Sequence, residues 1–105
     1  MTLIPEDCET MAEVRAGVDA TDAALINLLA TRFGYMRAAA RIKTDRGAVR
    51  DEARKAQVIA NVQALAAARG LPEPIITALW EQLVEGSIAF ELSIFDAATI
   101  ATAER

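Results

Sequence analysis

The sequence contains no histidine and a single cysteine, Cys8. A disulfide within the chain is therefore excluded, as are a zinc site of cysteine and histidine ligands and a catalytic triad that depends on histidine. Any catalytic chemistry has to come from arginine, lysine, aspartate, glutamate, serine or tyrosine side chains.

Basic excess and long apolar runs are also missing. The chain has 11 basic and 15 acidic residues, a formal net charge of -4, whereas nucleic-acid binding needs an excess of positive charge on one face. No run approaches the roughly 20 uncharged apolar residues of a membrane span, and the first seven residues do not resemble a secretion signal. We therefore expect a cytoplasmic protein without a nucleic-acid or membrane partner.

Proline is restricted to positions 5, 72 and 74, and alternating runs of β-branched residues are absent. The sequence therefore predicts an all-α fold of three helices. A chain of 105 residues with a hydrophobic share of 53% is typical of one globular domain, residues 1–105.

The first helix is predicted to begin after Thr10, which can form a capping box with Glu13, and it meets no proline before Gly47. The later boundaries follow from turn and cap residues. They are a loop at 45–48, a helix from about Asp51 to Arg69 closed by Gly70, a hinge at 71–74 and a helix from about Pro74 to Ala101.

A first helix of about 34 residues would be roughly 50 Å long. A compact monomer of this size has a radius of gyration of about 13 Å. The helix would therefore extend beyond the rest of the molecule and leave half of its apolar stripe in water. We therefore expect dimerisation. The alternative is a monomeric three-helix bundle in which the helix breaks at Gly34 or around residues 19–22.

Cations follow the apolar stripe of the first helix. The stripe consists of Val14, Val18, Leu25, Leu28 and Leu29, and it continues through Arg32, Met36, Ala39 and Lys43. Arg32 and Lys43 lie about three turns apart on one side, with roughly 16 Å between their backbones, which leaves room for a small dianion. Arg15 is about 25 Å from Arg32 along the helix, so it can reach the same ligand only across a dimer.

The other two helices also carry polar groups on their apolar stripes. Arg54 shares a stripe with Val58 and Val62, and Asp51 one turn earlier could orient its guanidinium. Ser87 and Glu91 are one turn apart in the third helix. Since buried charges are costly unless they are paired or bind a ligand, the combined set predicts an anion pocket.

Two structural readings stand beside this hypothesis. Arg32 and Lys43 could each be a side chain at the end of a stripe that reaches out to solvent. Arg37, Arg41 and Arg50 are expected on solvated faces.

The set resembles the motif of the all-helical chorismate mutase family. That motif has an arginine early in helix one, an arginine and a lysine eleven residues apart later in it, an arginine after an aspartate in helix two, and a polar pair in helix three. The matching residues here are Arg15, Arg32, Lys43, Asp51 with Arg54, and Ser87 with Glu91. The resemblance extends from about Pro5 to Phe95.

This resemblance implies an intertwined homodimer with two sites, each completed by the partner subunit's Arg15. It also implies conversion of chorismate to prephenate, a step of the shikimate pathway to aromatic amino acids that needs no cofactor or metal. Arginines would grip the two carboxylates of the substrate, and Lys43 would stabilise the negative charge that develops on its ether oxygen.

Two positions depart from the family pattern. Bacterial relatives usually have glutamine where this chain has Glu91, and only a protonated Glu91 could donate a hydrogen bond to the ether oxygen. Lys55 stands where a relative often has a glutamate that contacts the substrate hydroxyl.

Two other functions remain open. An isochorismate pyruvate-lyase, which releases pyruvate and leaves salicylate, has the same fold, and the opening residues 5–8 resemble that branch. Residues 45–54 are more similar to the mutases. A noncatalytic helical dimerisation module is the third hypothesis.

Overall fold

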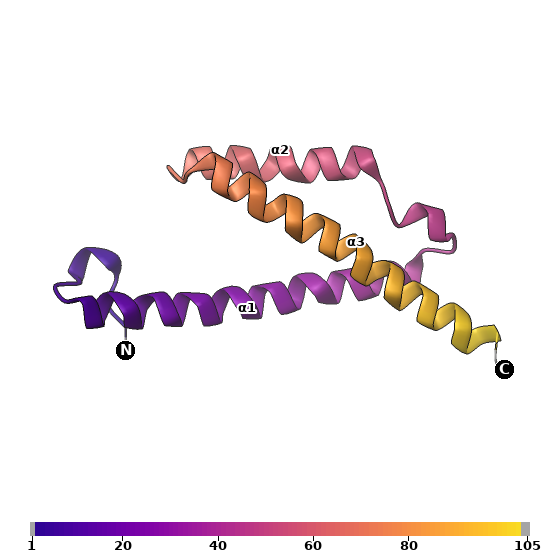
Figure 1. The fold of residues 1–105 in the computed structure, drawn as a ribbon, viewed down its shortest axis with the longest axis horizontal. Coiled ribbons are helices and arrows are strands. Elements are labelled where there is room, and N and C mark those ends of the chain that lie inside the picture. Colours follow the sequence, from indigo (N-terminus) through magenta and orange to yellow (C-terminus); the bar gives the residue numbers. More distant parts are fainter. Residues whose placement is uncertain (1, 104–105) are drawn as a thin grey trace. The chain divides into compact units, whose positions relative to one another are not determined.

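The computed structural model describes residues 2–103, which form three α-helices, two single-turn 3-10 helices and no strand (Figure 1). This confirms the all-α prediction with a very long first helix. The elements are η1 (Pro5–Asp7), α1 (Met11–Ile42), η2 (Arg46–Ala48), α2 (Glu52–Ala68) and α3 (Glu73–Ala103). The chain divides into two compact units, one ending at Gly34 and one beginning at Tyr35, and each is described by itself.

The predicted capping box starts α1. The backbone N–H of Glu13 donates to Thr10 Oγ1 at 3.2 Å, and the N–H of Thr10 donates back to Glu13 Oε1 at 3.0 Å. A hydrogen bond from the backbone of Glu9, together with one from the Thr10 side chain, lowers the pKa of Glu13. The helix then continues for 32 residues without interruption, so the alternative of a break at Gly34 or around residues 19–22 is wrong.

Much of the apolar stripe in the first unit is exposed. Val18 is 52% exposed, Leu25 is 51% exposed and Leu28 is 66% exposed. No other helix of this unit packs against them, because its remaining residues form only η1 and the adjoining N-terminal segment. These three apolar side chains of α1 are therefore more than half exposed.

Local signals set both ends of α2. The Asp51 carboxylate accepts from the N–H of Arg54 at the N-terminus. At the C-terminus Gly70 adopts φ 66°, the N–H of Leu71 donates to Ala66 O, and the N–H of Gly70 donates to Ala67 O. This is a Schellman motif, in which glycine tolerates the left-handed conformation. The loop predicted at 45–48 differs slightly, since Asp45 accepts from the N–H of Gly47 and caps η2.

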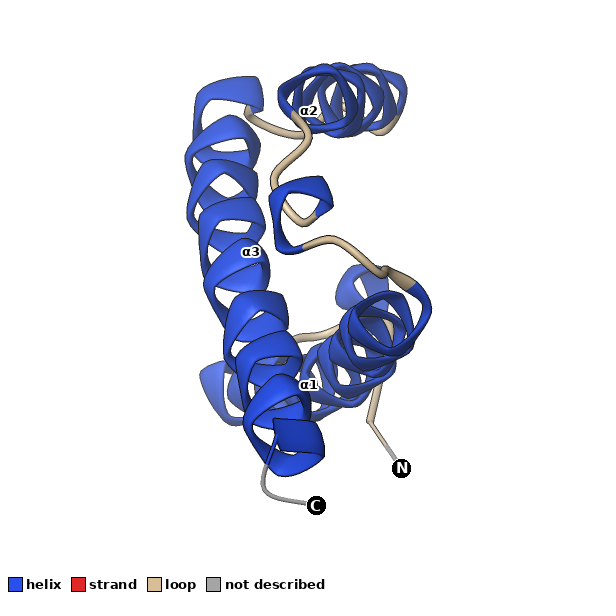
Figure 2. Cartoon of the chain, turned by 90° about the vertical axis from the view of Figure 1, so that its right-hand side faces the viewer, coloured by secondary structure: helices blue, strands red, loops and turns tan. Residues whose placement is uncertain are grey.

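In the second unit, α2 packs along the N-terminal half of α3 (Figures 1 and 2). Gln63 on α2 donates to Thr77 on α3 at 3.1 Å. Val84 is buried on α3, and the same helix buries Ser87 and Glu91 one and two turns later. The inward stripe of α3 thus changes from apolar to polar toward its C-terminal half, where the candidate site lies.

No helix within residues 2–103 has the length and hydropathy that crossing a bilayer requires.

Candidate functional site

A buried ion pair between Lys43 and Glu91 forms the centre of the candidate site. Lys43 directly follows α1, Glu91 lies in α3, and Lys43 Nζ donates to Glu91 Oε2 at 2.7 Å. The Glu91 side chain is only 5% exposed, whereas that of Lys43 is 29% exposed. Because a buried carboxylate is strongly destabilising without a partner, Lys43 is the residue that permits a charged group at position 91.

Ser87 lies one turn before Glu91 and is 3% exposed. Its hydroxyl donates to the carbonyl oxygen of Leu83 at 2.6 Å. The structure therefore brings together three of the predicted site residues in the second unit: Lys43, Ser87 and Glu91.

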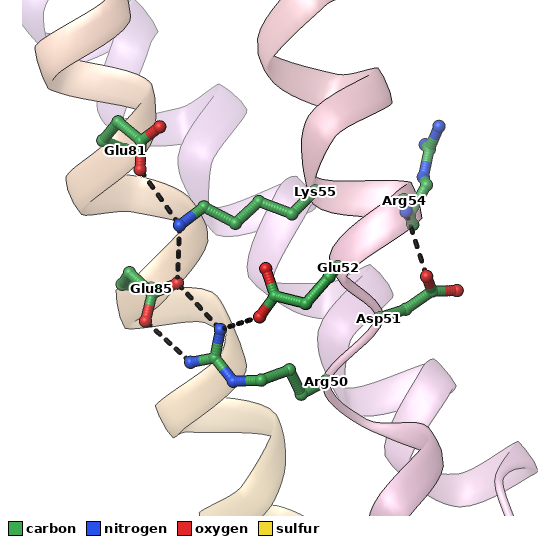
Figure 3. Close-up of polar contacts among 7 residues, drawn as sticks. All are labelled: Arg50, Asp51, Glu52, Arg54, Lys55, Glu81 and Glu85. Carbon is green, nitrogen blue, oxygen red and sulfur yellow. Dashed lines mark hydrogen bonds and ion pairs between the residues drawn. The ribbon is translucent and has the colours of Figure 1, made fainter.

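The other two predicted residues of this unit are arranged differently. The Asp51 carboxylate accepts from the backbone N–H of Arg54 at 3.0 Å, while the Arg54 guanidinium donates to Gln57 at 2.6 Å. The expectation that Asp51 orients the guanidinium was wrong, since Asp51 caps α2 instead. Arg54 is exposed, and Figure 3 shows its side chain on the opposite side of α2 from Glu81 and Glu85.

Arg15 and Arg32 belong to the first unit. Arg15 is exposed, and Arg32 is half-buried. Lys43, Ser87 and Glu91 all belong to the second unit.

An ion-pair network that the sequence did not predict joins the start of α2 to α3 (Figure 3). Glu85 accepts from Arg50 Nη2 at 2.7 Å and from Lys55 Nζ at 3.0 Å, and Lys55 also pairs with Glu81 at 3.0 Å. Arg50, expected on a solvated face, in addition contacts Glu52 at 2.8 Å. The sequence signal for this network was the pair of glutamates one turn apart on α3.

The network should make the folding stability of the chain depend on pH in the acid range. Hydrogen bonds from Arg50, and then from Lys55, lower the pKa of Glu85 from 4.5 to about 2. As the pH falls below 4.5, the unfolded chain therefore takes up a proton before the folded chain does, and the stability that Glu85 contributes above pH 4.5 is lost progressively toward pH 2. We expect Glu85→Gln to lower the urea midpoint at pH 6 and to have little effect near pH 2.

The matched control is Glu73→Gln, which removes a carboxylate of the same helix that makes no ion pair with residues 2–103. An equal loss at pH 6 in both variants would show that the network contributes nothing specific.

A second ion pair fixes the segment that follows Lys43. Arg46 of η2 donates to both carboxylate oxygens of Asp96 on α3, from Nε at 2.9 Å and from Nη2 at 3.2 Å. The Arg46 hydrogen bond lowers the pKa of Asp96. This bidentate contact holds the chain three residues after Lys43 against the helix that carries Glu91.

Among residues 2–103, no group of three or more cysteine, aspartate or glutamate side chains is arranged to hold a metal ion.

Comparisons with known proteins agree with the resemblance drawn from the sequence. The family described as chorismate mutase type II matches residues 14–92 of the chain. A protein of Pseudomonas aeruginosa described as isochorismate pyruvate lyase is 30% identical over 88 residues, which cover 84% of this chain and 87% of that protein.

Proposed function

The chain belongs to the chorismate mutase type II family, and from this premise we propose that it is an enzyme that rearranges chorismate to prephenate. The observation that carries the proposal is the partly accessible ammonium group of Lys43, held at 2.7 Å by the buried carboxylate of Glu91. A pair of this kind presents a fixed positive charge beside the face of α3 that also carries Ser87.

The chemistry of the reaction suits such a site. Chorismate is a dicarboxylate whose ether bond breaks while a carbon–carbon bond forms, a rearrangement that needs neither a nucleophile nor a general base. It needs one substrate conformer and a donor for the negative charge that builds up on the ether oxygen. An ammonium group has three N–H donors, and Lys43 uses one for Glu91, so others can serve that oxygen.

We assign the remaining roles as follows. Arg32, Arg54 and the partner subunit's Arg15 bind the two carboxylates, because guanidinium groups pair with carboxylates through two parallel hydrogen bonds. Ser87 contributes to substrate binding, and Asp51 contributes by fixing the start of α2 and hence the position of Arg54. Glu91 acts in its protonated form as a second donor to the ether oxygen.

Isochorismate pyruvate-lyase activity is the second candidate, and the relative from Pseudomonas aeruginosa that carries this description favours it. That elimination also acts on a dicarboxylate, so the same cations could bind either substrate. A noncatalytic dimerisation module is the third candidate, although it would have no use for an ion pair buried beside a serine.

The deciding experiment assays the purified chain with chorismate and isochorismate side by side. We expect consumption of chorismate with formation of prephenate, detected as phenylpyruvate after acid treatment. Salicylate from isochorismate without prephenate from chorismate would replace the mutase with the lyase. Turnover of neither substrate would reject both enzymes in favour of the module.

We also propose that the chain acts as an intertwined homodimer with shared active sites. The support is the exposed part of the apolar stripe of α1, where large side chains such as Leu25 and Leu28 are more than half exposed. A second copy that covers this stripe would remove apolar surface from water. Each Å² of apolar surface buried in this way stabilises the dimer by roughly 25 cal/mol.

The shared site predicts complementation between inactive chains. Arg15→Ala and Lys43→Ala are each expected to be inactive, yet a refolded equimolar mixture should regain activity, because half of the sites in each mixed dimer contain neither substitution. Sedimentation of the unmodified chain should give about twice the monomer mass of 11.3 kDa.

The control for complementation is each variant refolded alone. An active monomer in sedimentation, or a mixture no more active than its components, would contradict the shared site.

A further inference from the structure

A cavity separate from the Ser87 region lies between the end of α1 and the C-terminal turns of α3. Its volume is about 570 Å³, a size that suits a small organic ligand. Three cations line it, Arg37, Arg41 and Lys43. The apolar part of the lining includes Ile94, Phe95 and Ala98.

The cavity is positively charged although the whole chain has a net charge of -4. None of the residues within 2–103 that line it is acidic. Both carboxylates on the nearby part of α3 already have partners, since Glu91 pairs with Lys43 and Asp96 pairs with Arg46. Within this lining, no carboxylate therefore balances the charges of Arg37 and Arg41.

The two arginines are arranged to receive an anion. They lie one turn apart on α1, where like charges repel each other. The Arg37 guanidinium lies over the Phe90 ring, 5.7 Å from its centre, and Arg41 makes no ion pair with residues 2–103. A bound carboxylate would relieve the repulsion and accept hydrogen bonds from both side chains.

The rest of the lining restricts the ligand further. The hydroxyl of Thr99 donates to Phe95 O at 3.0 Å, and that of Thr102 donates to Ala98 O at 2.9 Å. With these protons engaged by the backbone, the arginines supply the hydrogen-bond donors for a ligand. The ligand should therefore combine one acidic group with an apolar body, unlike a sugar or another polyol.

We propose that this cavity binds a small aromatic monocarboxylate, with its ring on Ile94, Phe95 and Ala98 and its carboxylate between Arg37 and Arg41. The inference goes beyond the proposed function, because neither arginine is among the residues assigned to chorismate. Lys43 borders the cavity, so the ligand would lie next to the lysine assigned to the reaction.

The test measures binding of 3-phenylpropionate by calorimetry and by protein NMR. We expect saturable binding, with much weaker binding of the uncharged 3-phenylpropanamide and of acetate, which lacks the ring. Arg41→Gln should weaken 3-phenylpropionate binding about tenfold or more, the effect of losing a charge-assisted hydrogen bond. Arg69→Gln, an exposed arginine at the end of α2, is the matched control and should leave binding unchanged.

Four outcomes would overturn the proposal: no saturable binding, binding unaffected by Arg41→Gln, binding abolished by Arg54→Gln, or an altered oligomeric state in Arg41→Gln. The third would place the probe in the chorismate site, and the fourth would show that a second copy fills the cavity. Circular dichroism establishes that each variant is folded. Because the readout is binding of 3-phenylpropionate, its failure is distinct from a failure to turn over chorismate.

Discussion

Replacing Lys43 with methionine is expected to reduce kcat/KM for chorismate by a factor of roughly 100 to 1,000. Removal of one preorganised donor to a developing negative charge typically raises the barrier by about 3 to 4 kcal/mol. Methionine keeps most of the side-chain length and removes only the ammonium group that contacts Glu91 at 2.7 Å. Steady-state kinetics over a range of chorismate concentrations measures the effect, and Arg32→Ala should show a loss of similar size.

The control has to separate chemistry from stability, because Lys43→Met leaves the carboxylate of Glu91 buried without its cation. Lys43→Met combined with Glu91→Gln removes both charges and should restore stability without restoring the rate of the unmodified protein. Arg69→Met, which removes an exposed cation at the end of α2, should change the rate by no more than a few fold. An unchanged rate in Lys43→Met would show that the reaction takes place elsewhere in the molecule.

Replacing Glu91 with glutamine is expected to raise the rate of the reaction. A carboxylate beside the ether oxygen would repel the negative charge that develops there, whereas a hydrogen-bond donor stabilises it. Glu91→Gln has an amide that donates at every pH, and it also leaves Lys43 without a competing carboxylate. We therefore expect the variant to have a higher rate than the unmodified protein near pH 7. Initial rates at fixed ionic strength measure the effect.

Glu81→Gln is the matched control, because it changes a half-buried glutamate of the same helix that pairs with Lys55 and not with Lys43. Its rate should equal that of the unmodified protein. An inactive Glu91→Gln would contradict the donor role. That result would leave to Glu91 the contact seen in the structure, a hydrogen-bond partner that positions Lys43.

The sequence was most informative where a structural signal is local. The capping box of Thr10 and Glu13 and the glycine that closes α2 both depend on residues within a few positions of each other, and both predictions were confirmed. Helical spacing also placed Ser87 and Glu91 on the inward stripe of α3, where both are buried.

The sequence was less informative where contacts join distant segments. Lys43 and Glu91 are 48 residues apart, so their contact depends on how the end of α1 meets α3. Arg50 is exposed, as expected, but its ion pair with Glu85 was not predicted because Glu85 lies on another helix. Asp51 shows a different difficulty, since an aspartate three residues before an arginine can either cap the helix or bind the guanidinium.

The two ends of α2 also bear on the order of assembly. Asp51 fixes its first turn, and the Gly70 motif closes its last, through hydrogen bonds that span no more than five residues. Contacts this close in sequence need little loop closure and can form within microseconds, before distant segments meet. By the time α2 packs against α3 through the ion pairs of Arg50 and Lys55 with Glu85, both ends of α2 are therefore already formed. Weakening that network should therefore accelerate unfolding more than it slows folding.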